Sequence, residues 1–390
     1  MVPREHRARQ VLSIGHSYCV ALNRRLVNEM ARIGSPDWMV TAVAPSFFYG
    51  DLSPIRTDIR AIDLCRLQTV RAFLTRHIHV FFYSRELGQI LRGPWDVVHC
   101  WEEPYIFAGG QVAWWTPRAT PLIFWTGQNI AKLYPPPFSL IESYSVDRCA
   151  GWMARGQTGL DVLLSRNYRR KPHRAVPLGV DTERFYPDPT VRETTLARLG
   201  WAEFGGPPVV GYLGRFVEEK GLEVLIRALD ELPSDWRALF VGGGPLEKGL
   251  RQWSARYPDR VRVLTNIPHD QVPEYLNAMD VLCAPSQTRP NWREVFGRML
   301  IEAFACGVPV VGSDSGEIPY VVKDAGIIVG ERDQAGWVQA LGKLVENPSY
   351  RREMSARGLE RARSTYAWPA VARQHLDFLD EVLQSKTATQ

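Results

Sequence analysis

The chain has 390 residues, of which 45% are hydrophobic and 23% are charged, and its formal net charge is +5. These proportions are typical of a soluble globular protein and exclude a disordered or fibrous chain. A length of 390 residues is too great for one ordinary core, so two domains are expected. The six cysteines form no C-x-x-C pair, and buried free thiols are expected.

No part of the sequence predicts a secretory signal or a membrane span. The first ten residues are basic and polar and lack an apolar core, which predicts synthesis in the cytoplasm. The most apolar stretch, 104–130, is interrupted by an arginine and three prolines, so it falls short of the roughly 20 apolar residues that a spanning helix needs. A cytoplasmic protein is therefore expected, with a peripheral position at the inner face of the membrane as an alternative.

Basic residues outnumber acidic residues in the first half of the chain. One group, on the first expected helix, is Arg24, Arg25 and Arg32, and a later group is Arg166, Arg169, Arg170, Lys171 and Arg174. These groups fit either a solvated basic face or peripheral contact with an anionic membrane. No nucleic-acid partner is expected.

Strand and helix patterns alternate from the start of the chain. An apolar run at 11–15, helical spacing over 20–33 and a second run at 38–44 predict a β-α-β unit. Further strands are expected at 79–83, 96–100, 121–125 and 161–164, and helices at 84–91 and 138–153. Such alternation predicts a parallel sheet that is covered on both faces.

A segment rich in proline, 176–189, interrupts this alternation and is expected to be a linker. A second α/β series follows, with strands expected at 209–213, 238–241, 261–264, 281–284, 308–312 and 327–329. The expected domains are therefore 1–183 and 184–365, with a C-terminal helix over 366–390. Two doubly wound sheets are expected to bind ligands in a cleft at the carboxyl ends of their strands.

Two short patterns in the second half suit an activated sugar. Arg215 closes a strand and Lys220 precedes the next helix, where two cations and helix N–H groups can offset a diphosphate. Glu294 and Glu302 flank the helix-like stretch 295–301, and carboxylates there can accept hydrogen bonds from a sugar hydroxyl and a ribose diol. The backbone N–H groups near the helix start belong to Phe296, Gly297 and Arg298. Taken singly, each pattern also fits ordinary loop-to-helix chemistry.

The run 293–312 resembles the signature of glycosyltransferase family 4, whose members are retaining GT-B enzymes that use nucleotide sugars. The segments 214–221, 241–245, 280–286 and 316–319 resemble the same family in order and spacing. The resemblance implies an α/β GT-B fold with two Rossmann-like doubly wound parallel-sheet domains and an interdomain cleft. It implies an N-terminal domain on the acceptor side, a C-terminal domain for the nucleotide sugar, and a last helix that crosses back to the N-terminal domain.

The resemblance also implies roles for single residues. Arg215 and Lys220 would bind the donor diphosphate, Glu302 the ribose, and Glu294 the donor sugar at the reaction centre. Ile267, in the loop after the strand at 261–264, would pack against the nucleobase. The nucleotide-sugar donor is a substrate, the acceptor is a carbohydrate or a lipid-linked molecule, and no cofactor or metal is expected because the chain has no Asp-x-Asp motif. The expected setting is cell-surface polysaccharide or glycolipid synthesis.

The N-terminal half departs from the family pattern. The turn at 14–18 has one glycine where many relatives have a glycine-rich turn, and the segment 126–129 lacks the histidine that many relatives carry there. Acceptor-side candidates at the ends of expected strands are His16, Glu102, Glu103, Gln128 and Asn129. Of these, Gln128 and Asn129 can position a substrate but cannot exchange protons near neutral pH.

Other functions remain open to the same sequence. A nucleotide-sugar epimerase of related architecture would convert the donor without an acceptor, and a catalytically silent GT-B scaffold would only bind a partner or carbohydrate. A nicotinamide dehydrogenase is disfavoured, because the turn after the first strand lacks the G-x-G-x-x-G fingerprint.

Overall fold

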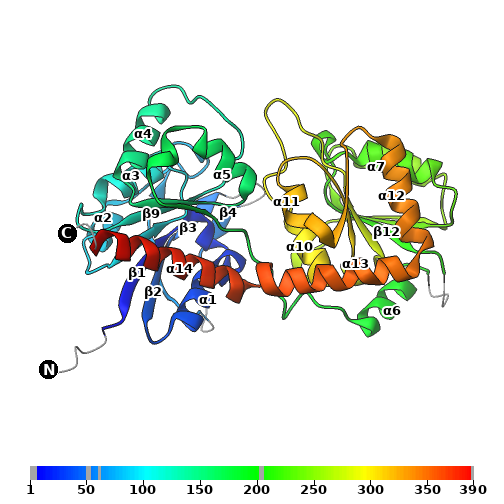
Figure 1. The fold of residues 1–390 in the computed structure, drawn as a ribbon, viewed down its shortest axis with the longest axis horizontal. Helices are drawn as coiled ribbons and strands as arrows, with labels where there is room; N and C mark the ends of the chain where they lie inside the picture. The colour runs from blue at the N-terminus through cyan, green and yellow to red at the C-terminus, as the bar shows by residue number, and fades with distance from the viewer. Residues whose placement is uncertain (1–6, 50–53, 60–62, 202–205, 388–390) are drawn as a thin grey trace. The chain divides into compact units, whose positions relative to one another are not determined.

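The computed structural model describes residues 7–49, 54–59, 63–201 and 206–387 (Figure 1). The chain divides into two compact units: unit 1 holds residues 1–177 and 368–390, and unit 2 holds residues 178–367. The division falls a few residues before the boundary expected after 183. Two contacts place that segment in unit 2: the Val180 N–H donates to the Tyr366 carbonyl at 2.8 Å, and Phe185 is buried in the core of unit 2.

In the described part of unit 1, seven parallel strands form a sheet in the order β11-β10-β9-β8-β1-β2-β5. The strands are β1 (Arg9–Ile14), β2 (Trp38–Pro45), β5 (Arg66–Val70), β8 (Val97–Cys100), β9 (Leu122–Thr126), β10 (Gly151–Ala154) and β11 (His173–Ala175). From β1 the chain passes first to β2 on one side and later to β8 on the other. The order therefore reverses between β1 and β8.

Helices and two small hairpins complete unit 1 (Figure 1). The helices are α1 (Arg25–Gly34), α2 (Arg85–Leu91), α3 (Phe107–Trp115), α4 (Phe138–Arg148), α5 (Gln157–Leu164) and α14 (Trp368–Thr387), with short 3-10 turns η1 (His16–Cys19), η2 (Ala21–Arg24) and η3 (Asn167–Arg170). The antiparallel hairpins pair β3 (Phe47–Tyr49) with β4 (Pro54–Arg56), and β6 (Ala72–Phe73) with β7 (Phe82–Tyr83). The C-terminal helix α14 packs against α1.

Two expected elements of unit 1 were wrong. The run 161–164 lies in helix α5, and not in a strand, because its three apolar residues cannot by periodicity alone distinguish a strand from a helix. The helix expected over 138–153 ends at Arg148, and a buried strand, β10, begins at Gly151. The continuous apolar character of that strand had extended the helical pattern.

In the described part of unit 2, six parallel strands form a sheet in the order β14-β13-β12-β15-β16-β17. They are β12 (Val209–Arg215), β13 (Arg237–Gly243), β14 (Val261–Thr265), β15 (Val281–Ala284), β16 (Val310–Ser313) and β17 (Gly326–Val329). This is the doubly wound order in which the first strand lies between the second and the fourth. Alternate residues of β12 serve separate cores, since Val209 and Val210 point to opposite faces of the sheet.

The helices of unit 2 cover both faces of its sheet. They are α6 (Pro189–Arg198), α7 (Leu222–Glu231), α8 (Glu247–Ser254), α9 (Val272–Asn277), α10 (Arg298–Ala305), α11 (Ile318–Val322), α12 (Gln334–Glu346) and α13 (Pro348–Arg361). Shorter helical turns are η4 (Glu218–Lys220), η5 (His269–Gln271), η6 (Lys323–Ala325) and η7 (Ala362–Tyr366).

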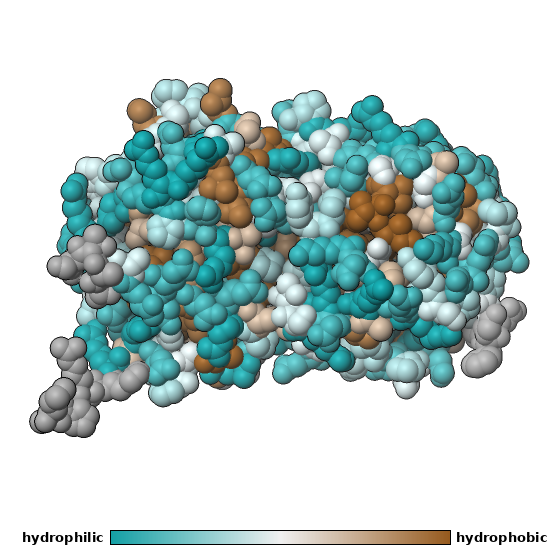
Figure 2. Space-filling model, in the orientation of Figure 1, coloured by the Kyte–Doolittle hydropathy of each residue, from teal (hydrophilic) through white to brown (hydrophobic). Residues whose placement is uncertain are grey.

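Among the described residues, no helix combines the length and the apolar character that crossing a membrane requires. On the face of the molecule in Figure 2, apolar side chains occur in separate small areas among hydrophilic ones.

Candidate donor site and acceptor-side residues

The order of the strands in unit 2 reverses between β12 and β15, and ligands of such sheets bind beyond the carboxyl ends of the strands at this point. Residues 216–221 follow β12, and residues 285–297 follow β15. These two loops contain Lys220, Glu294, Phe296 and Gly297, four of the residues expected from the sequence. The structure brings the two loops into direct contact through Lys220 and Glu294.

Glu294 is buried and is held by three loops of unit 2. Its Oε2 accepts hydrogen bonds from Lys220 Nζ at 2.5 Å and from Ser286 Oγ at 2.9 Å. Its backbone carbonyl accepts a bond from the Glu317 N–H at 3.0 Å. Lys220 follows β12, Ser286 follows β15 and Glu317 follows β16. The carboxylate is therefore fixed at the strand reversal before any ligand binds.

Two glycines make this approach of loops possible. Gly221 has a φ of +68°, and a Cβ built on it would lie 1.8 Å from the Pro285 carbonyl oxygen. Gly316 has a φ of +54°, and its Cβ would lie 2.1 Å from the Glu294 carbonyl oxygen. Only glycine has both the backbone freedom and the missing side chain that these contacts require.

The cations of the site differ in their surroundings. The Lys220 ammonium lies 5.1 Å from the centre of the Trp292 ring, in addition to its bond with Glu294. Arg215 is largely exposed, and its Nη2 lies 3.3 Å from Glu219 Oε1. The Tyr212 hydroxyl donates to the Arg215 carbonyl at 2.7 Å and fixes the end of β12. Burial, together with the negative charge of Glu294, raises the pKa of Tyr212, so this hydroxyl keeps its proton.

Helix α10 begins at Arg298, later than the expected helical stretch 295–301. Gly297 has a φ of +78° and precedes the first turn, while Phe296 is buried with its ring 5.9 Å from that of Tyr366. The N–H groups of the first turn of any helix have no carbonyl partner within the helix, and the first turn of α10 directly follows the loop that contains Glu294. Glu302 lies one turn further along α10.

Glu302 is buried beside the loop that follows β14. Its Oε1 lies 3.2 Å from His269 Nε2, and His269 belongs to η5 in that loop. Ile267 lies in the same loop, is half-buried and packs against the core of unit 2. The structure therefore places Ile267 and Glu302 on neighbouring segments at the carboxyl edge of the sheet.

Three side chains of this site were not anticipated from the sequence: Ser286, Trp292 and His269. Ser286 had a usable signal, because it follows a strand at the expected strand reversal. His269 lies only two residues beyond Ile267, but nothing in the pattern of the loop shows that a helix bearing Glu302 lies beside it.

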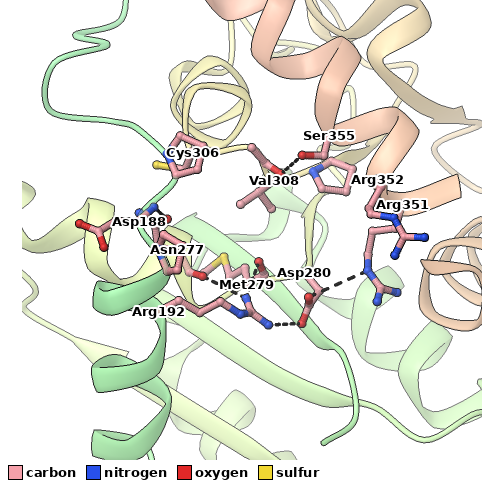
Figure 3. A pocket seen from close by; sticks show the side chains of 14 residues that line it. Asp188, Arg192, Asn277, Met279, Asp280, Cys306, Val308, Arg351, Arg352 and Ser355 are labelled. Atoms are coloured by element: carbon pink, nitrogen blue, oxygen red, sulfur yellow. Dashed lines mark hydrogen bonds and ion pairs between the residues drawn. The ribbon is translucent and has the colours of Figure 1, made fainter. Parts of the chain in front are cut away.

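A separate cavity of about 280 Å³ lies at the opposite edge of the sheet of unit 2, near the amino ends of β15 and β16 (Figure 3). Asp280 accepts a bond from Arg192 Nη2 at 2.9 Å and lies 3.9 Å from Arg351 Nε. It also accepts a bond from the Val209 N–H at 2.9 Å. Because this carboxylate ties α6 and α13 to the sheet, we interpret the cluster as structural.

In unit 1 the strand order reverses between β1 and β8, and His16 and Glu102 meet there. Glu102 is fully buried, and its Oε1 accepts bonds from the His16 N–H at 2.5 Å and the Tyr83 hydroxyl at 2.6 Å. Its Oε2 lies 2.6 Å from His16 Nδ1. This pair occupies the same topological position in unit 1 that Lys220 and Glu294 occupy in unit 2.

The other acceptor-side candidates have structural partners. Glu103 accepts bonds from the Thr126 hydroxyl and, at 2.8 Å, from the Gly127 N–H, and it lies 3.6 Å from Arg155. Gln128 is buried, and its Oε1 accepts a bond from Arg166 Nη1 at 2.9 Å. Asn129 is buried as well.

The expected basic surface is wrong for Arg24. This side chain is fully buried, donates to the Tyr18 carbonyl at 2.9 Å and lies 3.3 Å from both Asp58 and Asp63. In the later group, Arg166 pairs with Glu142, and Arg174 lies 2.6 Å from Glu381. These arginines hold elements of unit 1 together.

Residues 196–361 match the family described as Glycosyl transferases group 1. The chain is 36% identical over 202 residues to the GDP-mannose-dependent alpha-(1-6)-phosphatidylinositol monomannoside mannosyltransferase of Mycolicibacterium smegmatis, a match that covers 50% of this chain and 52% of that protein. It is 30% identical over 326 residues to the D-inositol 3-phosphate glycosyltransferase of Salinispora tropica, covering 75% of this chain and 65% of that protein.

Among solved structures, sucrose-phosphate synthase from Thermosynechococcus elongatus superimposes with a TM-score of 0.70 at 20% identity, over 97% of this chain and 100% of that one. The two doubly wound units thus have the GT-B fold. Residues 196–361, which match the group 1 glycosyltransferases, contain the Lys220–Glu294 pair. It spans about half to two thirds of the length of the two curated relatives named above.

Proposed function

We propose that the protein is a retaining glycosyltransferase that moves a sugar from a nucleoside diphosphate sugar to a hydroxyl acceptor. The observation that carries this proposal is the Lys220–Glu294 pair at the strand reversal of unit 2, within the matched domain. The names of the relatives put GDP-mannose first among donors to test, and molecules containing inositol first among acceptors. The proposed setting is the synthesis of a glycolipid or cell-surface polysaccharide.

Donor binding would use groups from the loops and the helix at the carboxyl edge of this sheet. The Lys220 ammonium has three N–H donors, so it can bond Glu294 and a diphosphate oxygen together. Arg215 would supply a second cation. The backbone of Phe296, Gly297 and Arg298 would approach the phosphate or the sugar, Glu302 would accept bonds from the ribose diol, and Ile267 would pack on the base.

Transfer would proceed through an oxocarbenium-like transition state. The bond from the anomeric carbon to the phosphate oxygen breaks and its electron pair stays with the phosphate, where Lys220 and Arg215 offset the charge. The acceptor oxygen then bonds to the same face of the anomeric carbon, and its proton passes to the leaving phosphate. Glu294 would hold a hydroxyl of the donor sugar in place. Because these cations supply the positive charge, we propose that no divalent metal is required.

On the acceptor side, we propose that Glu102 orients His16. A carboxylate bonded to Nδ1 favours the tautomer that carries its proton there, which leaves Nε2 as an acceptor for the hydroxyl of the incoming molecule. Glu103, Gln128 and Asn129 would shape the same edge of unit 1.

Glu294→Gln is the sharpest test, because the amide keeps the size of the side chain and can still accept the Ser286 bond. We expect transfer from GDP-mannose, assayed with EDTA present, to fall by at least about 100-fold, since positioned groups at a reaction centre contribute this much.

Lys220→Ala should weaken the binding of GDP, measured by calorimetry. The matched controls are Glu360→Gln on α13 and Lys248→Ala on α8, both of which change exposed side chains.

Near-normal turnover in a folded Glu294→Gln variant would remove the assignment of Glu294, and unchanged GDP affinity in Lys220→Ala would remove the diphosphate site. A requirement for added divalent cation would contradict the metal-free mechanism. Conversion of the donor sugar without an acceptor would indicate an epimerase. Tight donor binding without any product, across a range of acceptors, would indicate a binding scaffold.

A further inference from the structure

Residues 71–85 of unit 1 form a hairpin with two chemically different faces; we name it the basic hairpin. Ala72 pairs with Tyr83 and Phe73 pairs with Phe82 in the antiparallel β6–β7 ladder. Phe81 and Tyr83 point inward and are buried in the core of unit 1. The backbone of Tyr83 also exchanges hydrogen bonds with the Gln111 side chain on α3, at 2.7 and 2.8 Å. The hairpin is therefore firmly attached to the unit.

The outward face of the basic hairpin is apolar. Phe73 is 46% exposed, Leu74 57%, Ile78 40% and Phe82 37%, and the rings of Phe73 and Phe82 lie 5.3 Å apart. Leu74 has a φ of +55°, a region that residues with a Cβ seldom adopt. Single exposed apolar residues are common, but four within ten positions of one hairpin indicate a surface that meets an apolar partner.

The charge around these side chains is mainly positive, although Glu86 borders the segment and its Oε2 accepts bonds from the Arg71 N–H at 3.4 Å and the Ser84 hydroxyl at 3.1 Å. Arg71, Arg76 and Arg85 are exposed, and the segment 71–85 contains neither aspartate nor glutamate. Within residues 7–49, 54–59, 63–201 and 206–387, no carboxylate forms an ion pair with any of these three arginines. Arg76 instead lies over the Tyr49 ring at 4.4 Å. Three exposed arginines that form no ion pair in the described part of the chain lie beside an apolar face, and this combination matches an anionic lipid surface, which is acidic at its headgroups and apolar just beneath.

We propose that the basic hairpin docks unit 1 on a bilayer that contains anionic lipids. The apolar side chains would enter the boundary between headgroups and acyl chains, and the arginines would contact the anionic headgroups. This surface lies in neither basic group expected from the sequence, since Arg24 of the first group is buried and Arg166 and Arg174 of the second are paired with carboxylates.

The inward face of the same hairpin contacts the acceptor-side residues. The Tyr83 hydroxyl donates to Glu102 at 2.6 Å, and the Phe81 ring lies 5.4 Å from the His16 ring. Docking would bring the His16–Glu102 pair close to the membrane surface, where a lipid-linked acceptor would be available. This consequence for the acceptor rests on the proposed function, whereas the docking itself does not.

Cosedimentation with vesicles tests the proposal, using phosphatidylcholine alone and phosphatidylcholine with about 30% phosphatidylglycerol. We expect binding to the anionic vesicles only, and weaker binding as the salt rises from about 0.1 M to about 1 M, because the screening length shortens from about 10 Å to about 3 Å. Arg71→Gln with Arg85→Gln should weaken binding by about fivefold for each arginine. Phe73→Ser with Phe82→Ser should weaken it by at least about tenfold.

The matched controls change exposed residues of unit 1 outside the hairpin: Arg169→Gln with Arg170→Gln on η3, and Leu140→Ser on α4. The Glu294→Gln variant should bind vesicles normally, so that failure of docking and failure of the proposed chemistry are separable. A polarity-sensitive dye on Leu74→Cys should report an apolar environment with anionic vesicles, and the native cysteines are all buried. Absence of vesicle binding, or equal losses in the controls, would overturn the proposal.

Discussion

A single backbone position, Gly221, sets the geometry of the candidate donor site. Its φ of +68° costs a residue with a Cβ roughly 1–3 kcal/mol, and an added Cβ would also meet the Pro285 carbonyl at 1.8 Å. In Gly221→Ala, the loops after β12 and β15 must therefore separate, and Lys220 must move away from Glu294. We expect unit 2 to lose at least about 2 kcal/mol of stability and to bind GDP more weakly.

Denaturant titration and calorimetry would measure both effects. Gly243→Ala is the matched control, because Gly243 ends the neighbouring strand β13 and an added Cβ there meets nothing within 4 Å. If both variants lose equal stability, the close approach of the loops at Gly221 does not determine the geometry of the site.

At this scale the sequence indicated the charged residues of the donor site but few of their neighbours. Lys220, Glu294 and Glu302 could be placed because their spacing repeats a known pattern around a strand and a helix. Ser286 and His269 could not, since each meets its partner only through loops that are brought together by the strand order. Arg24 shows the same limit, because its carboxylate partners lie more than thirty positions away in the chain.

At the scale of elements, helix α14 brings a second buried histidine to the end of β8. His375 of α14 and His99 of β8 are both fully buried, with ring centres 5.1 Å apart, and His99 Nδ1 lies 2.7 Å from the Ser13 hydroxyl. Burial lowers the pKa of His99 to about 4 from an ordinary value of 6.5. Burial, and then the charge of His99, lowers the pKa of His375 as well.

The sign of the resulting pH dependence follows from these two directions. Below pH 6.5 the unfolded chain takes up protons that the folded histidines refuse, so the free energy of unfolding declines as the pH falls toward 4. For His99 the loss over this range is about 3 kcal/mol. We expect His99→Asn, whose amide can still bond Ser13, to flatten this part of the stability profile of unit 1.

Thermal or denaturant unfolding between pH 4 and pH 7 measures the effect, and His77→Asn, which changes an exposed histidine, is the control. An unchanged slope in His99→Asn would show that His99 does not cause the loss of stability at low pH.

The helices and strands were largely predictable where the apolar pattern extended over many residues and turn residues marked its two ends. All six strands of unit 2 were expected within a few residues, because a parallel sheet buried on both faces needs continuous apolar runs. Helix α5 and strand β10 were missed because each is short and carries too few apolar residues to show a period, so that packing against the rest of unit 1 decides its conformation. The strand expected at 79–83 is shorter than predicted. Strand β7 covers only Phe82–Tyr83, and the residues before it belong to the connection from β6.

At the scale of the whole molecule, each unit has a buried glutamate bonded to a basic side chain at its own strand reversal. His16 and Glu102 lie after β1 and β8, and Lys220 and Glu294 lie between β12 and β16. The two sheets share this arrangement because both are doubly wound. In such sheets, the connections on the two sides of the strand reversal leave toward opposite faces, and a crevice opens between them. The proposed ligands are nevertheless different, a nucleotide sugar for unit 2 and a hydroxyl acceptor with its membrane for unit 1.

Hydrogen exchange on the full chain can separate these two roles in one experiment. With GDP, we expect slower exchange at 215–221 and 286–302, because a ligand that binds the folded state suppresses local opening around its site. With anionic vesicles, we expect slower exchange at 71–85 and none of the GDP pattern. The Lys220→Ala variant should lose the first response and keep the second, while Arg71→Gln with Arg85→Gln should do the reverse. Protection of 71–85 by GDP alone, or of 286–302 by vesicles alone, would contradict the assignment of donor and membrane to separate units.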